Sequence, residues 1–518
     1  MALINKRKLF YLLGAGIVAF WLVMVALLIR KTHFHEVDQV AGTPIQAELE
    51  SVERFQHDWM EIYLKGKKVG FSETKVSPLG GDQLIQEKMV LALNLMGQPS
   101  VVRMTTRAVV DKGFLLKRFR LVIDSGVVRF RVSGKVEENR MVVEVGEGDR
   151  KRDHLIPLAG PLTIGAGLPG FFKGCALGIG DAFRFTFFDP SILSHKEMLI
   201  KVTGKTVISV DGREYPAFRL ETEVWGQTLV FWLDEEGVLL KEEGFMGLTL
   251  VRSDKDRAPF DVEGSAGVDF YDAAAIPVKQ TLKRPREINY LKVKVAGLQG
   301  TGFNLSVLNE GRQKLRKNML EIHQESLPSS ALSKRLKADM APHMKPFMLP
   351  GINIQSDDRA LVEKTGEIVG SETDRRVVAR KLMGWVYENV EKRPVVSVPD
   401  ALAVLETRVG DCNEHAVLLT ALLRAAGIPA RECVGIVYTD HRFFYHAWTE
   451  AYLGHWISMD ATLNQMPTDA THIKLVHGGL EKQAELMALM GKLQMDVVDY
   501  TYDSVDQSFQ KVQNTPGR

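Results

Sequence analysis

One stretch decides the fold of this chain, GDCNEHAVLLTALLRAAGIP, which occupies residues 410–429. Asp411 is a good N-cap residue, and Glu414, three positions later, can close a capping box. The run that follows is apolar on nearly all sides, which is typical of a helix buried inside a protein. Gly427 is a natural C-terminal cap. The stretch therefore predicts a buried helix whose first residue is Cys412.

The place of Cys412 in this helix has a chemical consequence. The first turn of a helix has free backbone N–H groups and carries the positive end of the helix dipole. Both favour an anion, so we expect the pKa of the thiol to be lowered. A thiolate at the exposed tip of a rigid helix is suited to nucleophilic catalysis.

A second stretch downstream could supply the other groups that such a nucleophile needs. Residues 444–452, FYHAWTEAY, and residues 456–462, WISMDAT, predict two strands of a hairpin. Because side chains alternate between the faces of a strand, a three-residue loop at 453–455 places His446 and Asp460 on one face. We then expect the Asp460 carboxylate to lie about 3 Å from a His446 ring nitrogen.

These two motifs, GDCxEHAxLLxALLRAAGIPAR and HAWxExYxxxWxxxDAT, resemble the core of the transglutaminase-like superfamily, which shares the papain-like cysteine protease fold. The resemblance covers about residues 357–475. It implies that Cys412 is the nucleophile, His446 the general base and acid, and Asp460 the group that orients His446. Where bacterial relatives often have Asp-Pro-Thr, this chain has Ala461 after the aspartate, and the carboxylate is retained.

Other chemically active residues near these motifs are predicted to be structural. Free cysteine is among the most buried residue types, so we expect Cys433 and Cys175 to pack in the interior. His415 is expected to pack inside the protein, and Trp448 and Glu450 to support the fold. No paired CxxC and no HExxH occurs in this region, so we predict no metal site and no cofactor.

Composition limits the classes of function. The chain has 518 residues, 45% of them hydrophobic and 25% charged, with a formal net charge of +2. This is the composition of an ordinary folded protein of two or three domains. A charge so close to zero argues against a nucleic-acid partner. Three widely spaced cysteines give no disulfide framework.

The N-terminal region predicts a membrane anchor. The run from Leu9 to Ile29 contains 21 residues and no charge, enough to span the hydrocarbon core of about 30 Å. No signal-peptidase site follows it, so we expect an uncleaved, single-pass anchor in the cell (inner) membrane. Three basic residues precede the run and two follow it, which favours a cytoplasmic N-terminus and a periplasmic position for the rest of the chain.

Between residues 54 and 255 the sequence predicts an antiparallel β domain, a curved sheet or half-barrel. Short runs rich in Val, Ile, Leu, Phe and Thr alternate with turn signals, as in VRFRV at 128–132. The stretch GAGLPG at 165–170 matches a dinucleotide-binding fingerprint in letters only. Pro169 and the glycines after it should prevent the required helix, so we predict a loop there.

The fold class is therefore α+β, with the transmembrane helix first, the β domain second and the papain-like domain last. Helices are expected at 357–368, 372–392, 401–407 and 480–493. The predicted divisions are an anchor (1–31), a spacer (32–53), the β domain (54–255), a connector (256–285), an entry segment (286–356), the catalytic domain (357–503) and a tail (504–518).

These features together predict a membrane-anchored, extracytoplasmic enzyme that transfers acyl groups from peptide or protein amides through Cys412. We favour a protease or amidase over a cross-linking enzyme. Two alternatives of other classes remain open. The chain could be a tethered binding or scaffold protein without activity, or a lipid or lipoprotein carrier that uses the β domain. An apolar, ligand-sized pocket within residues 59–251 would favour the carrier.

Overall fold

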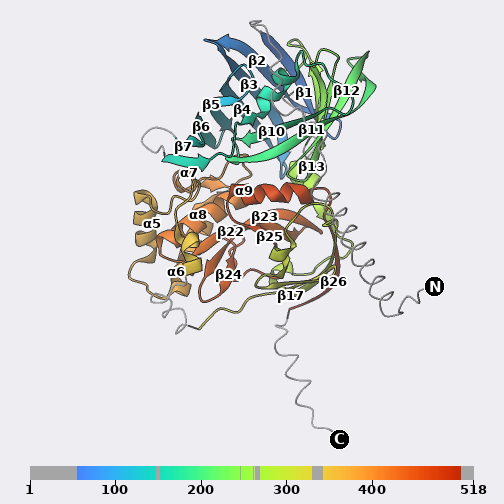
Figure 1. Cartoon of the computed structure of the whole chain (residues 1–518). Coiled ribbons are helices and arrows are strands. Elements are labelled where there is room, and N and C mark those ends of the chain that lie inside the picture. Colours follow the sequence, from blue (N-terminus) through green and yellow to red (C-terminus); the bar gives the residue numbers. More distant parts are fainter. Residues whose placement is uncertain are drawn as a thin grey trace, which may run out of the picture.

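The computed structural model describes residues 55–146, 152–244, 247–260, 262, 269–329 and 342–502. The predicted anchor, spacer and tail lie outside these residues. Within them, no helix is both long enough and apolar enough to cross a membrane. The described chain forms a β domain and a mixed C-terminal domain, and the β domain lies above the C-terminal domain in Figure 1.

The β domain is one curled sheet of fifteen strands. The antiparallel pair β1 and β15 lies in the middle of the sheet. On the β1 side the strands follow in the order β2 to β8, and on the β15 side they follow in the order β14 to β9. All neighbours are antiparallel except β9 and β10. The strands are β1 (Gln56–Leu64), β2 (Lys67–Leu79), β3 (Asp82–Leu95), β4 (Gln98–Val110), β5 (Leu116–Asp124), β6 (Arg129–Glu137), β7 (Arg140–Val145), β8 (Arg152–Pro157), β9 (Thr163–Ile164), β10 (Ala182–Asp189), β11 (Ser194–Val210), β12 (Arg213–Val224), β13 (Gln227–Leu233), β14 (Leu239–Glu243) and β15 (Leu248–Ser253).

The prediction of a curled antiparallel sheet is confirmed, but the prediction of a loop at 165–170 is wrong. A 3₁₀ turn, η2 (Gly165–Gly167), leads into a short helix, α2 (Leu168–Phe172). Pro169 lies in the first turn of α2, where a missing N–H costs nothing because that N–H would have no helical partner. The segment packs against β3 and β10.

The C-terminal domain contains two small sheets and a group of helices. One sheet has the order β16, β23, β22, β25, with β24 paired to β23, and the other has the order β18, β19, β17, β26. Their strands are β16 (Ile276–Pro277), β17 (Tyr290–Ala296), β18 (Gln313–Arg316), β19 (Met319–His323), β22 (Ala430–Thr439), β23 (Arg442–Tyr452), β24 (Trp456–Met459), β25 (Ile473–His477) and β26 (Gln494–Thr501), and a further parallel pair is β20 (Glu391–Lys392) and β21 (Val409–Gly410).

Helix α8 (Cys412–Ala425) is the centre of this domain. It packs against β23 and β22 on one side and against three other helices on the other. Its residues from Val417 to Leu423 are wholly buried, as their apolar sequence predicted. The remaining helical segments are α3 (Phe270–Ala274), η4 (Pro285–Glu287), η5 (Leu305–Asn309), η6 (Pro342–Met348), α5 (Arg359–Val369), α6 (Arg375–Asn389), α7 (Ala401–Thr407), α9 (Leu480–Ala484) and η7 (Glu485–Leu489).

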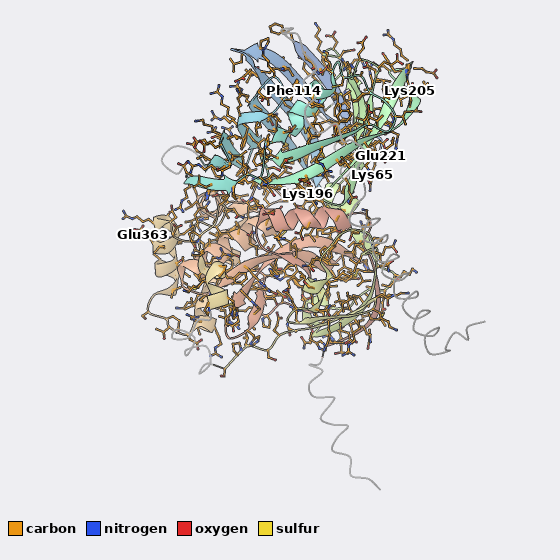
Figure 2. The ribbon with its side chains drawn as sticks, viewed as in Figure 1. Lys65, Phe114, Lys196, Lys205, Glu221 and Glu363 are labelled. Atoms are coloured by element: carbon orange, nitrogen blue, oxygen red, sulfur yellow. The ribbon has the colours of Figure 1, made fainter. Side chains whose placement is uncertain are left out.

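The two domains contact each other through several segments. Arg152 of the β domain forms ion pairs with Asp357 and Asp358, at 2.7 and 2.9 Å. Late in the chain, Ala484 of α9 joins an apolar cluster of the β domain. The connector also lies between the domains, and its strand β16 pairs with the end of β23. Figure 2 shows side chains filling the space between the two domains.

Candidate active site

The N-terminus of α8 is built as the sequence predicted. The Asp411 side chain accepts a hydrogen bond from the Asn413 backbone N–H at 2.8 Å. The Glu414 side chain accepts a hydrogen bond from the Asp411 backbone N–H at 3.0 Å, which completes the capping box. Cys412 is thus the first residue of a well-capped helix. The backbone N–H of Ala447 lies close enough to the thiol to lower its pKa, so Cys412 lies beside the strand that carries His446.

The hairpin of β23 and β24 has the predicted register. Tyr452 pairs with Trp456 across a loop of three residues, 453–455. This register places His446 and Asp460 on the same face, and His446 Nε2 lies 2.7 Å from Asp460 Oδ2. Both the loop length and the predicted distance of about 3 Å are confirmed.

Asp460 is wholly buried and every one of its oxygens has a partner. Oδ1 accepts from the backbone N–H groups of Thr462 and Leu463, at 2.7 and 3.0 Å. Oδ2 receives both His446 Nε2 and, at 3.0 Å, His472 Nε2. Burial alone would raise the pKa of Asp460, but the two histidines outweigh it and hold that pKa well below its usual range. Asp460 is therefore an anion at neutral pH.

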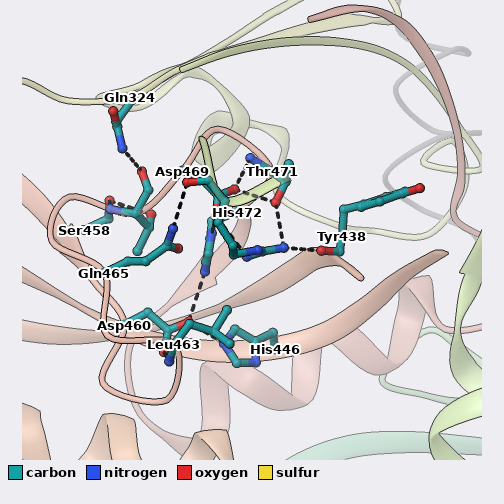
Figure 3. Close-up of polar contacts among 12 residues, drawn as sticks. Gln324, Tyr438, His446, Ser458, Asp460, Leu463, Gln465, Asp469, Thr471 and His472 are labelled. Carbon is teal, nitrogen blue, oxygen red and sulfur yellow. Dashed lines mark hydrogen bonds and ion pairs between the residues drawn. The ribbon is translucent and has the colours of Figure 1, made fainter. Parts of the chain in front are cut away.

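His472 is a residue of this site that the sequence reasoning missed. It is wholly buried between Asp460 and Asp469, with its Nδ1 3.4 Å from Asp469 Oδ2. Burial lowers its pKa, but the two carboxylates more than compensate and raise it. Asp469 in turn forms an ion pair with Arg286 at 2.9 Å. Figure 3 shows His446, Asp460, His472 and Asp469 among the polar contacts of this region.

A sequence signal for His472 existed but was weak. Asp469 and His472 stand three positions apart, directly before the buried strand β25. Charged groups that are buried beside a strand need a partner of opposite charge or a hydrogen bond. Asp460 is such a partner for His472. Nothing local to either residue indicates that the chain folds back to Asp460, so the contact becomes visible only in three dimensions.

A second missed residue is Tyr271, which comes from the connector. Its hydroxyl donates to Asp411 Oδ2 at 2.9 Å. Its ring packs against apolar residues of the β domain. Burial and the neighbouring Asp411 and Cys412 raise the pKa of Tyr271 far above its usual range, so the hydroxyl keeps its proton. The connector thus places a hydrogen-bond donor on the N-cap of the helix that carries Cys412.

The expectation that the pKa of Cys412 is lowered is wrong. Burial raises the pKa of this thiol well above its usual range, and the carboxylates of Asp411, Glu414 and Asp460 add to the effect. The backbone N–H of Ala447 opposes the increase without cancelling it. The helix start alone therefore does not produce a thiolate, and deprotonation of Cys412 needs a neighbouring base.

The other residues predicted to be structural have structural partners. His415 is wholly buried, and its Nδ1 lies 2.7 Å from the Asp411 carbonyl oxygen. Cys433 is buried, whereas the Cys175 thiol is half-buried and donates to the Phe171 carbonyl oxygen at 3.2 Å. Trp448 is buried and stacks on His446, with ring centroids 6.4 Å apart.

His446, Asp460 and His472 also form the one group in the described part of the chain with the composition and spacing of a metal site. Their ligand atoms lie within 4.8 Å of one another. Both imidazoles, however, already contact the same carboxylate oxygen at hydrogen-bond distance. The three residues therefore form a hydrogen-bonded charge network around Asp460, in which His472 Nδ1 has an ion-pair contact with Asp469 but no hydrogen bond among the described residues.

Comparisons with known proteins identify a family for part of the chain. Residues 363–461 match the family model of the transglutaminase-like superfamily. No curated protein matches the chain. Among similar solved structures is a candidate cysteine protease from Cytophaga hutchinsonii, with 20% identity over 41% of this chain and 86% of that chain and a TM-score of 0.28. The periplasmic domain of TgpA from Pseudomonas aeruginosa has 15% identity over 37% of this chain and 87% of that chain, with a TM-score of 0.24. A candidate protease from Parabacteroides distasonis has 11% identity over 66% of this chain and 68% of that chain, with a TM-score of 0.19.

These scores are too low for the neighbours to tell anything about activity. The family match is more specific, because it contains α8 and the hairpin of β23 and β24. Residues 363–461 of this chain are therefore a domain of the transglutaminase-like superfamily.

Proposed function

We propose that this protein is a cysteine-nucleophile enzyme that cleaves amide bonds of peptides or proteins. The observation that carries the proposal is the hydrogen bond of 2.7 Å between His446 Nε2 and Asp460 Oδ2, beside the capped helix start at Cys412. A group that holds an imidazole in one orientation next to a thiol is the arrangement that covalent acyl transfer requires.

In the proposed mechanism each nitrogen of His446 has its own task. Nε2 carries the proton that is donated to Asp460, so Nδ1 is the basic nitrogen available to Cys412. Since burial and carboxylates disfavour a free thiolate at Cys412, the proton leaves only when Nδ1 accepts it. The ionised Asp460 stabilises the imidazolium that results.

The proposed reaction has two steps. Cys412 Sγ attacks the amide carbonyl carbon, the thiol proton passes to His446, and the C–N bond breaks as His446 protonates the leaving amine. Water, deprotonated by His446, then attacks the thioester and releases the acid and the free thiol. The Cys412 backbone N–H, at the first position of α8, can donate to the oxyanion because it has no partner inside the helix.

We further propose that the anchor at Leu9–Ile29 holds this domain on the extracytoplasmic side of the cell membrane. In that location peptides and peptide cross-links are the available substrates.

The test incubates the full-length protein with a peptide library derived from digested proteins, together with a biotinylated alkylamine. We expect new peptide N-termini and no incorporated amine, because water is the proposed acceptor. Cys412→Ala should abolish the products, whereas Cys175→Ala, a change at the half-buried thiol of the β domain, should not. Incorporated amine without cleavage would replace hydrolysis by transamidation. The absence of both products would favour a non-catalytic scaffold.

A further inference from the structure

The curled sheet of the β domain encloses a cavity of about 440 Å³. This lies within the range of about 300–1,000 Å³ that is typical of small-molecule sites. Most of its lining is apolar, and η2, α2 and the turn after β10 contribute to it. The cavity is separate from Cys412 and His446, neither of which lines it. It is the ligand-sized apolar pocket that would favour a carrier function.

The registers of the sheet arrange the lining in rows. One row crosses four neighbouring strands as Met60, Ser72, Met89 and Met104. Methionine side chains are flexible and adapt to irregular apolar partners. Trp225 and Phe231 face the same cavity from the other half of the sheet. Such a surface suits a flexible hydrocarbon chain.

The adjacent row is polar and contains two carboxylates. It runs from Asp58 through Thr74 and Glu87 to Thr106. Glu242 faces the cavity from β14. The curl of the sheet brings its carboxylate close enough to Glu87 for the charge of Glu87 to raise its pKa. Burial, with the charge of Glu87, raises the pKa of Glu242 to about 7, and burial also raises the pKa of Glu87.

These two carboxylates lack a cation. Asp58 has Arg252 at 3.1 Å, but neither Glu87 nor Glu242 forms an ion pair with any lysine or arginine in the described ranges. Two ionised carboxylates that line a largely apolar cavity are costly unless a positive charge lies near them. A ligand with an ammonium group would supply that charge.

We propose that the cavity binds one amphiphile, with its hydrocarbon chain against the methionine row and its primary ammonium group between Glu87 and Glu242. The apolar wall supplies most of the affinity, since each buried CH₂ contributes about 0.8 kcal/mol. The carboxylate pair selects the head group by charge complementarity. This inference does not depend on the proposed peptidase activity.

The test uses three probes of the same chain length, dodecylamine, dodecanol and dodecanoate, at pH 8 and below their micelle concentrations. Binding to the full-length protein is followed by displacement of the neutral dye N-phenyl-1-naphthylamine. We expect dodecylamine to bind at least tenfold more tightly than dodecanol, and dodecanoate to bind most weakly.

Variants separate the two parts of the proposal. The double change Glu87→Gln and Glu242→Gln keeps the shape of the cavity and should weaken dodecylamine at least tenfold without altering dodecanol. Glu243→Gln is the matched control, because Glu243 is the exposed next residue of β14. Met104→Trp should weaken all three probes by filling the cavity, with thermal unfolding confirming that the variant is folded.

Three results would overturn the proposal. They are failure of all three probes to displace the dye, equal affinity for dodecylamine and dodecanol, and an unchanged dodecylamine affinity in the glutamine double variant. Because each readout is binding, loss of peptidase activity in Cys412→Ala has no effect on any of them.

Discussion

Glu450 shows how a buried charge supports the candidate site without taking part in it. It is almost wholly buried on β23, with Lys474 Nζ at 2.8 Å and Arg431 Nη2 at 2.6 Å. Burial would raise its pKa, but the two cations outweigh it and lower that pKa to about 2. These contacts connect β23, which carries His446, to β22 and β25.

Glu450→Gln should therefore destabilise the protein by roughly 3–5 kcal/mol at pH 7, since it leaves two buried cations without their main partner. The measurement is urea unfolding. The folded pKa of Glu450, about 2, is below its ordinary value of 4.5, so its contribution is complete above pH 4.5 and is lost as the pH falls toward 2. The difference between wild type and variant should shrink over that range.

The control is Glu367→Gln, at an exposed glutamate on α5. Surface changes of this kind stay within about 0.5 kcal/mol. A Glu450→Gln variant as stable as this control would contradict the role assigned to the buried ion pairs.

At the scale of elements, local rules predicted α8 and the hairpin of β23 and β24 well. The cap residues Asp411 and Glu414 predicted the first residue of α8 correctly. After the end of α8, Gly427 has the positive φ, 72°, that a C-terminal cap requires. Strict alternation along a strand allowed only an odd loop if His446 was to reach Asp460, and the loop has three residues.

Elements whose form depends on distant contacts were predicted less well. The helix expected at 480–493 ends at Leu489, as α9 followed by the 3₁₀ turn η7. The loop expected at 165–170 is a 3₁₀ turn and a short helix that pack on the curled sheet. The contributions of His472 and Tyr271 likewise depend on contacts across the fold that no local pattern encodes.

The pKa of Cys412 is the clearest case of tertiary structure outweighing a local rule. The helix start favours a thiolate, and this much follows from sequence. Burial and the carboxylates of Asp411, Glu414 and Asp460 have the larger effect, and together they raise the pKa of the thiol. Deprotonation of Cys412 therefore needs a neighbouring base, and the base that we propose is His446.

At the scale of the whole molecule, the β domain and the connector reach the candidate site. Tyr271 contacts Asp411 on one side and an apolar cluster of the β domain on the other. That cluster includes Met89 and Leu250, which also line the cavity. The sheet, the connector and α8 are thus in continuous contact.

The position of the whole molecule rests on the predicted anchor at Leu9–Ile29. The full-length protein should stay in the membrane fraction after an alkaline carbonate wash, because 21 uncharged residues can be removed from a bilayer only at great cost. A chain that starts at Val37 should be soluble. Recovery of a processed, soluble chain that begins after Ile29 would show that the segment is a cleaved signal instead.

The most direct test of the central claim is the rate at which iodoacetamide alkylates Cys412 between pH 6 and 7, compared with the rates at Cys175 and Cys433. In the proposed mechanism His446 takes the proton from Cys412, so this thiol should react fastest in the wild type, and His446→Ala should reduce its rate to that of the other two. A Cys412 that reacts no faster than Cys175 and Cys433, or that keeps its rate without His446, would contradict the assignment of Cys412 as a nucleophile activated by His446.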